Sequence, residues 1–277
     1  MNTYPASQQS PKRPPDRPPS QWTRLIVKLA NFWLDLRRRV QPWQSQLTEL
    51  NEIILRARSR SDISDHLVPL FAEAMSVRPR LLVELGVRGG ASTFVLERVA
   101  RLVGARLVSV DMDDCSRVCS WNRWHFVQSD DIAFAKAFPD WCAARQIQPC
   151  IDFLFIDTSH LFEHTVQEID AWFPFLSDHA RVAFHDTNIQ KVYLRRDGSR
   201  GAGWANQRGV IAALEKHFGV PFNEQAYFVE VMNGWLIRHD PVCCGFTVLT
   251  KFHPGADSSD TIRPRHAPGE LSNVMPR

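Results

Sequence analysis

Acidic residues stand where apolar segments of the chain end. They are Glu84, Asp111, Asp157 and Asp186. Two of these ends also carry an imidazole, because His160 follows Asp157 in the run FIDTSH and His185 precedes Asp186 in the run HDTN. Two carboxylates and an imidazole that converge can hold one divalent cation, and hard oxygen ligands favour Mg²⁺ or Mn²⁺. Such an ion would orient an acceptor hydroxyl and lower its pKa.

A glycine-rich turn follows the first of these segments, in the stretch VELGVRGGAST. Its pattern departs from the dinucleotide fingerprint G-x-G-x-x-G, because Arg88 replaces the second glycine. A nicotinamide cofactor is therefore disfavoured. Glu84 just before the first glycine and Asp111 at the next strand end suit a smaller nucleoside with ribose hydroxyls and a cationic amino group. S-adenosylmethionine is such a ligand.

The elements that position these residues alternate between apolar strands and helices. Strands are expected at 80–85, 106–111, 124–128, 151–157 and 181–185, and helices at 91–102, 131–145, 162–176 and 207–218. Near-continuous apolar strands separated by helices predict a parallel sheet covered on both faces, which binds ligands at its carboxyl edge. Beyond it, segments 227–232 and 246–249 are expected to form an antiparallel edge pair. The arginine-rich loop 191–203 between them and the core is a candidate lid.

The two ends of the chain differ from this core. Residues 1–20 are rich in proline and poor in large apolar groups, so they and residues 254–277 are expected to be disordered. Residues 21–60 are predicted to be a helical extension, and residues 61–253 the functional domain. The extension begins with a basic amphipathic helix over 21–40. We favour packing on its own domain or on a second copy, and a peripheral contact with an anionic membrane is the alternative.

Composition limits the class of protein. With 277 residues, 44% hydrophobic and 23% charged, the chain fits one large α/β domain with appendages. The six cysteines lack paired spacing and secretory context, which disfavours disulfides and zinc. Without a membrane-spanning run, the composition predicts a soluble cytoplasmic protein. Nucleic acid is an unlikely partner, because the basic residues concentrate in the N-terminal head and one loop.

The motifs in order, VELGVRGGAST, VSVD, QSDD, FIDTSH and AFHDTN, resemble a class I S-adenosylmethionine-dependent methyltransferase. The pattern is most similar to small-molecule O-methyltransferases of the catechol O-methyltransferase-like, cephalosporin-hydroxylase-like and macrolide-sugar groups. The resemblance covers about residues 64–252. It implies a Rossmann-like, doubly wound and mostly parallel seven-stranded sheet with an antiparallel edge pair.

The resemblance also implies a cofactor site. Its residues would be Glu84, Gly86, Gly90 and Ser92 at the methionine end, Asp111 at the ribose, Ser129 and Asp130 near the adenine, and Asp157 at the next strand end. The alternative is structural: the glycines form a turn, and Asp111, Ser129 and Asp130 cap the segments that follow.

In metal-dependent relatives the ligand positions map onto Asp157, His185 and Asp186, and the general base maps onto His160. Position 185 departs from the pattern, because a relative would usually carry a carboxylate there. The alternative is that His160 caps a helix, that Asp186 caps the element that follows it, and that His185 is a buried histidine with its hydrogen bonds satisfied.

Together these features predict methyl transfer from S-adenosylmethionine to a hydroxyl of a small molecule, a sugar or a phenolic natural product, assisted by Mg²⁺ or Mn²⁺. We expect a homo-oligomer. One alternative is a metal-independent O- or N-methyltransferase. Another is a non-catalytic nucleoside-binding module that its N-terminal helix attaches to a membrane or a partner.

Overall fold

The computed structural model describes residues 45–203 and 208–252, together with a few helical positions in the N-terminal segment. The chain divides into two units, 1–46 and 47–277, and each is considered by itself. In the first unit the helical positions are Trp22, Leu25, Ile26, Lys28, Leu29 and Phe32. The tails predicted to be disordered lie outside the described residues, and what the helix over 21–40 contacts stays a prediction. Among the described helices, none has the length and apolarity to cross a bilayer.

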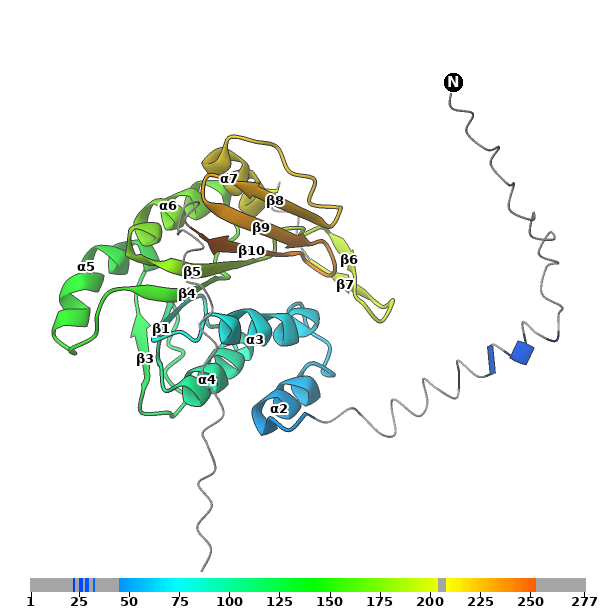
Figure 1. Ribbon diagram of the computed structural model, residues 1–277, viewed down its shortest axis with the longest axis horizontal. Coiled ribbons are helices and arrows are strands. Elements are labelled where there is room, and N and C mark those ends of the chain that lie inside the picture. The colour runs from blue at the N-terminus through cyan, green and yellow to red at the C-terminus, as the bar shows by residue number, and fades with distance from the viewer. Residues whose placement is uncertain are drawn as a thin grey trace, which may run out of the picture. The chain divides into compact units, whose positions relative to one another are not determined.

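The second unit is built on an eight-stranded sheet in the order β3-β2-β1-β4-β5-β10-β9-β8 (Figure 1). The parallel strands are β3 (Trp124–Gln128), β2 (Arg106–Asp111), β1 (Leu81–Leu85), β4 (Ile151–Ile156) and β5 (Leu176–His185). The antiparallel strands are β10 (Phe246–Lys251), β9 (Trp235–Asp240) and β8 (Phe228–Met232). The structure confirms a mostly parallel α/β sheet.

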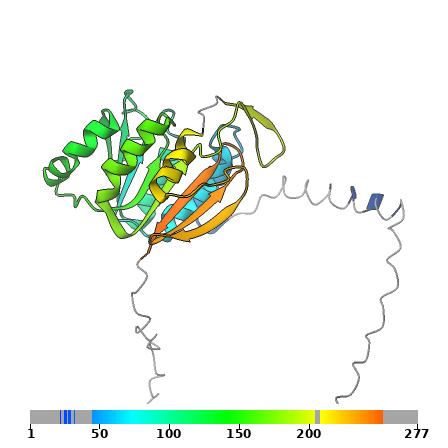
Figure 2. The ribbon, with the colours of Figure 1, turned by 90° about the horizontal axis from the view of Figure 1, so that it is seen from above.

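Helices cover both faces of this sheet (Figures 1 and 2). One layer holds α2 (Thr48–Arg56), the short 3₁₀ turn η1 (Ser64–His66), α3 (Leu67–Ser76) and α4 (Ala91–Val103), and the other holds α5 (Asp131–Ala143), α6 (Phe162–Trp172), the 3₁₀ turn η2 (Phe173–Phe175) and α7 (Gly209–Phe218). Successive residues of a strand pack against opposite helix layers: Leu82 packs with α3 and α4, whereas Val83 packs with α5 and α6. Both layers need apolar partners, which explains the continuous apolar strands.

The chain reverses its direction of winding between β1 and β4. From β1 it builds outward to β2 and β3, and then returns to place β4 on the other side of β1. The register brings the strand ends level, with Leu85 opposite both Val110 and Ile156, and Ile156 opposite Phe184. This switch point is where α/β sheets of this kind bind ligands.

The antiparallel edge differs from the prediction. The sheet has eight strands instead of seven, and the two segments expected to pair, now β8 and β10, are separated by β9. The missed strand carries polar residues such as Arg238 and His239, so its apolar pattern is weak. Asn233 and Gly234, both at positive φ, join β8 to β9 in a two-residue turn. This Asn-Gly pair was the available signal for a hairpin.

The arginine-rich loop also has regular structure. Within it, β6 (Val192–Leu194) and β7 (Arg200–Ala202) form an antiparallel hairpin. Arg195 at its tip donates a hydrogen bond to the backbone oxygen of Ser61 at 3.3 Å. The segment is therefore a folded hairpin attached to the start of the domain, and its role as a lid stays a prediction.

Candidate active site

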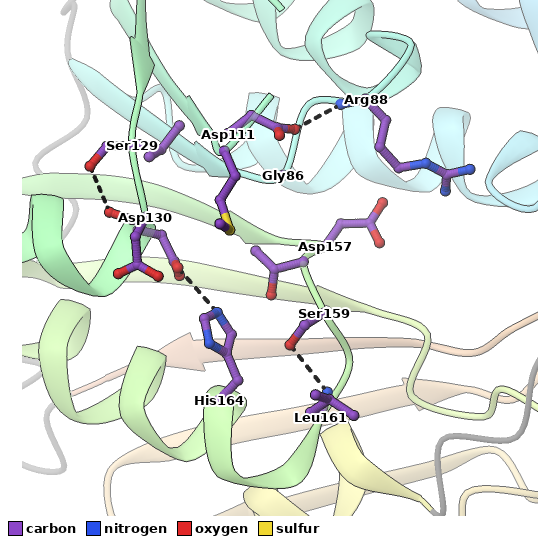
Figure 3. A pocket seen from close by; sticks show the side chains of 13 residues that line it. Gly86, Arg88, Asp111, Ser129, Asp130, Asp157, Ser159, Leu161 and His164 are labelled. Carbon is purple, nitrogen blue, oxygen red and sulfur yellow. Dashed lines mark hydrogen bonds and ion pairs between the residues drawn. The ribbon is translucent and has the colours of Figure 1, made fainter. Parts of the chain in front are cut away.

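A cavity of about 380 Å³ opens at the carboxyl ends of the parallel strands (Figure 3). Its walls include the predicted residues Gly86, Asp111, Ser129, Asp130 and Asp157, with Arg88, Met112, Leu161 and His164. A smaller cavity of about 150 Å³ lies along the glycine loop and includes Ser92 and Asp62. Gly86, Arg88 and Asp157 line both cavities, so the loop after β1 stands between the two.

The glycines of this loop are required by close contacts. Gly86 has φ +88°, and a Cβ added to it would lie 2.0 Å from the backbone oxygen of Asp157. Gly90 precedes α4 in the left-handed conformation, and its Cβ would lie 2.0 Å from Val118 Cγ1. Only glycine fits at either position. At Gly89 a Cβ would meet nothing within 4 Å, so this glycine is not required in the same way.

Asp111 organises the loop from the end of β2. Its Oδ2 accepts hydrogen bonds from the backbone N–H groups of Val87 at 2.7 Å and Arg88 at 3.0 Å. Burial alone would raise the pKa of Asp111, but these amides outweigh it and the pKa is lowered. The carboxylate is therefore held in its charged form at the cavity wall, where it suits a ribose hydroxyl.

Glu84 lies beneath the loop and lines neither cavity. It is fully buried, and its Oε2 accepts hydrogen bonds from Thr93 Oγ1 at 2.8 Å and Ser109 Oγ at 2.6 Å. Burial raises the pKa of Glu84 to about 7, although hydrogen bonds from Ser109, Ser92 and Thr93 lower it in part. Its contacts join the start of α4 to β2, and direct cofactor binding by Glu84 stays a prediction.

Ser129 and Asp130, which follow β3, are placed for both of the roles considered for them, helix capping and contact with a ligand. Asp130 is the N-cap of α5, where its Oδ1 accepts a hydrogen bond from the backbone N–H of Ala133 at 2.8 Å. Ser129 donates to the backbone oxygen of Asp130 at 2.9 Å. Both nevertheless line the larger cavity, so capping and ligand contact are compatible at this position.

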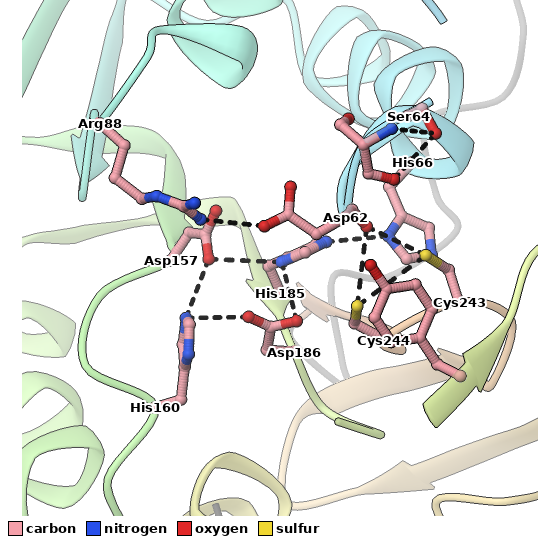
Figure 4. A network of polar contacts seen from close by, with 12 residues as sticks. Asp62, Ser64, His66, Arg88, Asp157, His160, His185, Asp186, Cys243 and Cys244 are labelled. Atoms are coloured by element: carbon pink, nitrogen blue, oxygen red, sulfur yellow. Dashed lines mark hydrogen bonds and ion pairs between the residues drawn. The ribbon is translucent and has the colours of Figure 1, made fainter. Parts of the chain in front are cut away.

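The residues after β4 and at the end of β5 form what we call the strand-end cluster: Asp157, His160, His185 and Asp186 (Figure 4). His160 Nε2 lies 3.0 Å from both Asp157 Oδ1 and Asp186 Oδ2. His185 Nδ1 lies 3.3 Å from both Asp157 Oδ1 and Asp186 Oδ1. The structure thus brings all of these predicted residues together, and Asp157 also lines the cavities.

Charge and backbone conformation are unusual in this cluster. Burial alone would raise the pKa of Asp157, but His185 and the hydrogen bond from His160 outweigh it, and the pKa lies well below its usual range. Burial alone would lower the pKa of His185, yet Asp186 and Asp157 hold it well above its ordinary value. His160 and Asp186 adopt positive φ values of 58° and 56°. Such backbone strain in non-glycine residues is commonest at functional sites.

Sequence reasoning missed further contacts of this cluster. His66 is fully buried, and its Nδ1 lies 3.0 Å from His185 Nε2. Burial and the neighbouring His185 hold the pKa of His66 well below its ordinary value. Arg88 extends over the same region and donates to Asp62 Oδ2 at 3.0 Å (Figure 4). His66 had no local signal, because its partner lies 119 residues away.

A second group of similar residues lies beside the larger cavity, and we call it the helix cluster: Asp131, His164 and Glu168. His164 Nε2 lies 3.1 Å from Asp131 Oδ1 and 3.6 Å from Glu168 Oε1. Thr158 Oγ1 donates to Glu168 Oε1 at 2.6 Å. Burial, followed by the charge of Asp131, raises the pKa of Glu168 well above its usual value, which favours the protonated form of this carboxyl.

The strand-end cluster fits a divalent cation. Ligand atoms of Asp157, His160 and Asp186 lie within 4.8 Å of one another. Among the described residues, Asp186 Oδ1 and His185 Nδ1 are buried and make no well-formed hydrogen bond, although they lie 3.3 Å from each other. Buried polar atoms without partners are rare, and an ion between carboxylates and an imidazole would satisfy them.

The fold and this site define a Rossmann-like α/β domain with a nucleoside-sized cavity at its switch point. Residues 83–187 match the model of a methyltransferase domain family. The match confirms the resemblance to class I methyltransferases and the expectation that the protein is an enzyme. No curated protein matches the chain.

Solved structures that resemble the chain are distant in sequence. The SAH-bound methyltransferase PaMTH1 of Podospora anserina is 12% identical, with TM-score 0.49, over 86% of this chain and 99% of that one. MycE from the mycinamycin pathway, in complex with Mg, SAH and mycinamycin VI, is 18% identical, with TM-score 0.47, over 80% of this chain and 58% of that one. A putative caffeoyl-CoA O-methyltransferase from Staphylococcus aureus is 11% identical, with TM-score 0.46, over 81% of this chain and 99% of that one.

Proposed function

We propose that the protein transfers the methyl group of S-adenosylmethionine to a hydroxyl of a small molecule. The observation that carries this proposal is the position of Asp157, which lines both cavities beside the glycine loop and belongs to the strand-end cluster. A donor in the cavities and an acceptor at the cluster would meet at this residue. Orientation of two bound reactants supplies much of the rate enhancement in such a transfer.

The donor site follows from the two cavities. The larger one, with Asp111 at its wall, would take the adenosine, and the smaller one, with Ser92, would take the methionine end. The loop at Gly86 passes between them and would approach the sulfonium centre. Asp111, kept charged by backbone amides, is suited to accept the ribose hydroxyls.

The chemical step is a displacement at carbon. The acceptor oxygen forms a bond to the methyl carbon while the carbon–sulfur bond breaks, and the sulfur keeps that electron pair. The hydroxyl proton passes to Nδ1 of His160, because its Nε2–H already faces the carboxylates of Asp157 and Asp186, each at 3.0 Å, and these stabilise the resulting imidazolium. A divalent ion held by Asp157, His185 and Asp186 would lower the pKa of the hydroxyl when bound.

Room for an acceptor exists beyond the cluster. A cavity of about 620 Å³ lies between the β6–β7 hairpin and residues 241–243, and Asn188 lines it two positions after Asp186. The side chain of Asn188 donates to the backbone oxygen of Pro241 at 2.8 Å, which fixes it at the wall. This volume suits a sugar or a phenolic compound. A homo-oligomer and a cytoplasmic location remain expectations.

One observation favours a metal-independent version of the same reaction. Because Asp157 and Asp186 hold the pKa of His185 well above its ordinary value, an imidazolium alone can occupy the space between these carboxylates. The charges of the cluster would then balance without an ion. Methyl transfer that persists in the presence of a strong chelator would select this alternative.

The test is binding of S-adenosylhomocysteine measured by calorimetry, followed by methyl transfer from labelled S-adenosylmethionine to a panel of sugars and phenols. Gly86→Ala should weaken binding by about 100-fold or more, because its Cβ overlaps the backbone of Asp157. Gly89→Ala is the matched control in the same loop and should bind within about threefold of wild type, since its Cβ meets nothing within 4 Å. Lack of binding by the wild-type protein would refute the proposal.

A further inference from the structure

His66 connects the strand-end cluster to a part of the chain outside the matched methyltransferase segment. It ends the 3₁₀ turn η1 and lies 17 residues before that segment begins. Its Nδ1 lies 3.0 Å from His185 Nε2, and its Nε2 lies 3.0 Å from the backbone oxygen of Val242 (Figure 4). The two imidazoles therefore form a buried chain from a carbonyl to the carboxylates of the cluster.

The direction of the hydrogen bonds in this chain follows from its two ends. A carbonyl oxygen only accepts, so the contact with Val242 requires a proton on His66 Nε2. His66 is fully buried and stacks on Phe246, surroundings that favour a neutral ring; a neutral imidazole carries one N–H, which leaves a lone pair on His66 Nδ1. His185 Nε2 must then donate to that lone pair. The nitrogen of His185 that faces Asp157 and Asp186 is consequently Nδ1.

Packing holds both rings in this arrangement. The His66 ring stacks on Phe246 with centroids 5.3 Å apart and an interplanar angle of 16°. It meets the edge of the His185 ring at 5.1 Å and 73°. Phe246 lies opposite His185 in the β10–β5 pairing, so the strand register fixes all three rings together. Rotation of either imidazole would disrupt this stack as well as the hydrogen bonds.

We propose that His66 is a positioning residue: it holds His185 Nε2 and so directs His185 Nδ1 at the two carboxylates, where a bound ion would replace the Nδ1 proton and meet an imidazole nitrogen, so that the strand-end cluster prefers Mn²⁺ or a later first-row ion over Mg²⁺. A hydrogen bond to the outer nitrogen of a ligating histidine fixes its tautomer and orientation. Imidazole nitrogen suits transition metals, whereas Mg²⁺ favours oxygen ligands. This inference rests on the metal-assisted form of the proposed function.

The first experiment determines the direction of the hydrogen bonds between His66 and His185 in protein without metal or substrate. Long-range ¹H–¹⁵N correlation spectra of the full chain report which nitrogen of each histidine carries a proton. His66 is expected to be neutral with its proton on Nε2. A proton on Nδ1 of His66 would reverse the chain and overturn the proposal, whatever the outcome of methyl-transfer assays.

The second experiment measures Mn²⁺ and Mg²⁺ binding, with pulsed electron paramagnetic resonance of bound Mn²⁺ as the readout of nitrogen coordination. Wild type should bind Mn²⁺ more tightly and show coupling to a ligand nitrogen. His66→Phe keeps a ring against Phe246 but loses both hydrogen bonds, so Mn²⁺ affinity should fall about 10- to 100-fold and the nitrogen coupling should weaken. His66→Asn keeps a hydrogen-bond acceptor near His185, so it should recover part of the Mn²⁺ affinity and part of the nitrogen coupling.

The matched control is His125→Phe, because His125 also packs against an aromatic ring, that of Trp141, but belongs to β3. It should bind Mn²⁺ as wild type does, and thermal unfolding would show that each variant is folded. Unchanged Mn²⁺ affinity in folded His66→Phe, or a wild-type preference for Mg²⁺, would overturn the proposal. If the wild-type protein binds Mn²⁺ as expected but transfers no methyl group, the result would count against the proposed function instead.

Discussion

The strand-end cluster and the helix cluster contain nearly the same side chains, and each has ligand atoms close enough to share a metal ion, but their carboxyls differ in charge. Each places an imidazole nitrogen between two carboxylates, and each has a residue at the larger cavity. In the strand-end cluster the pKa of Asp157 is lowered, because His185 and the hydrogen bond from His160 outweigh burial. In the helix cluster burial and the charge of Asp131 raise the pKa of Glu168.

The backbone explains this difference. Asp131 begins α5, and His164 and Glu168 are one turn apart on α6, so the helix cluster forms on regular helices that pack against each other. The strand-end cluster instead depends on positive φ at His160 and Asp186 and on a second imidazole from His66. In the proposed assignment, similar side chains thus form a cation site in one place and a carboxyl with a raised pKa in the other. Residue type alone does not define a metal site.

Removing one carboxylate from each cluster should give the largest contrast. Asp157→Asn removes a carboxylate that contacts both His160 and His185, and methyl transfer should fall by about 100- to 10,000-fold. Asp131→Asn should lower the rate by less than about tenfold, because the helix cluster takes no part in the proton transfer. Turnover of the two variants under identical conditions checks the pair. Equal losses would show that the comparison is wrong.

Metal stoichiometry sharpens the same comparison. Wild type is expected to bind one Mn²⁺ per chain, Asp186→Asn none, and Asp131→Asn one. Asp186 is a proposed ligand, whereas the raised pKa of Glu168 leaves the helix cluster with less negative charge to attract a cation. Elemental analysis after dialysis against Mn²⁺ measures this. A second ion in wild type that Asp131→Asn removes would place a metal in the helix cluster. Chelator treatment should also abolish methyl transfer, and added Mn²⁺ should restore it.

The smallest effect concerns the pH dependence of stability. The folded-state pKa of Glu168 is raised, so between its unfolded value of 4.5 and its folded value the native state binds more protons and stability falls as pH rises. Asp157 has the opposite sign, because its lowered pKa stabilises the fold above 3.8 and that stability is lost as pH falls toward the folded pKa. Glu168→Gln mimics the protonated carboxyl and should flatten the decline above pH 4.5.

Urea unfolding at several pH values measures this change. At neutral pH the free energy of unfolding of Glu168→Gln should lie within about 1 kcal/mol of wild type, or above it, because Gln keeps an acceptor for Thr158. Glu168→Ala is the comparison variant and should cost about 2 kcal/mol or more, since it leaves the buried Thr158 hydroxyl without its acceptor and opens a cavity. A strong loss in Glu168→Gln would mean that the carboxyl is charged.

Much of the architecture could be predicted from local patterns. The apolar runs predicted the parallel strands, and the acids at their ends predicted which side chains meet, because parallel strands end at one edge. Strand β9 was missed since its alternation includes Arg238 and His239, which weakens the apolar signal. The Asn233–Gly234 turn before it was the better guide.

The site was less predictable where contacts join distant parts of the chain. The contacts of Asp157, His160 and Asp186 follow from strand order, but the partner of His185 lies 119 residues away and no local pattern marks it. The placement of Glu84 beneath the loop depends on Thr93 and Ser109, one from a helix and one from a neighbouring strand. The spacing of His164 and Glu168, one helical turn apart, was a usable signal for the helix cluster.

The contact between Gly86 and Asp157 has a mechanical consequence. The missing side chain of Gly86 lets the loop rest directly on the backbone of Asp157, where a Cβ would lie 2.0 Å from the carbonyl oxygen. In the proposed reaction, the gap between donor and acceptor would therefore be set by two touching stretches of main chain, with no side chain in between that could rotate. The transfer distance would then follow from the pairing of β1 and β4, which runs up to Leu85 and Ile156, the residues just before Gly86 and Asp157.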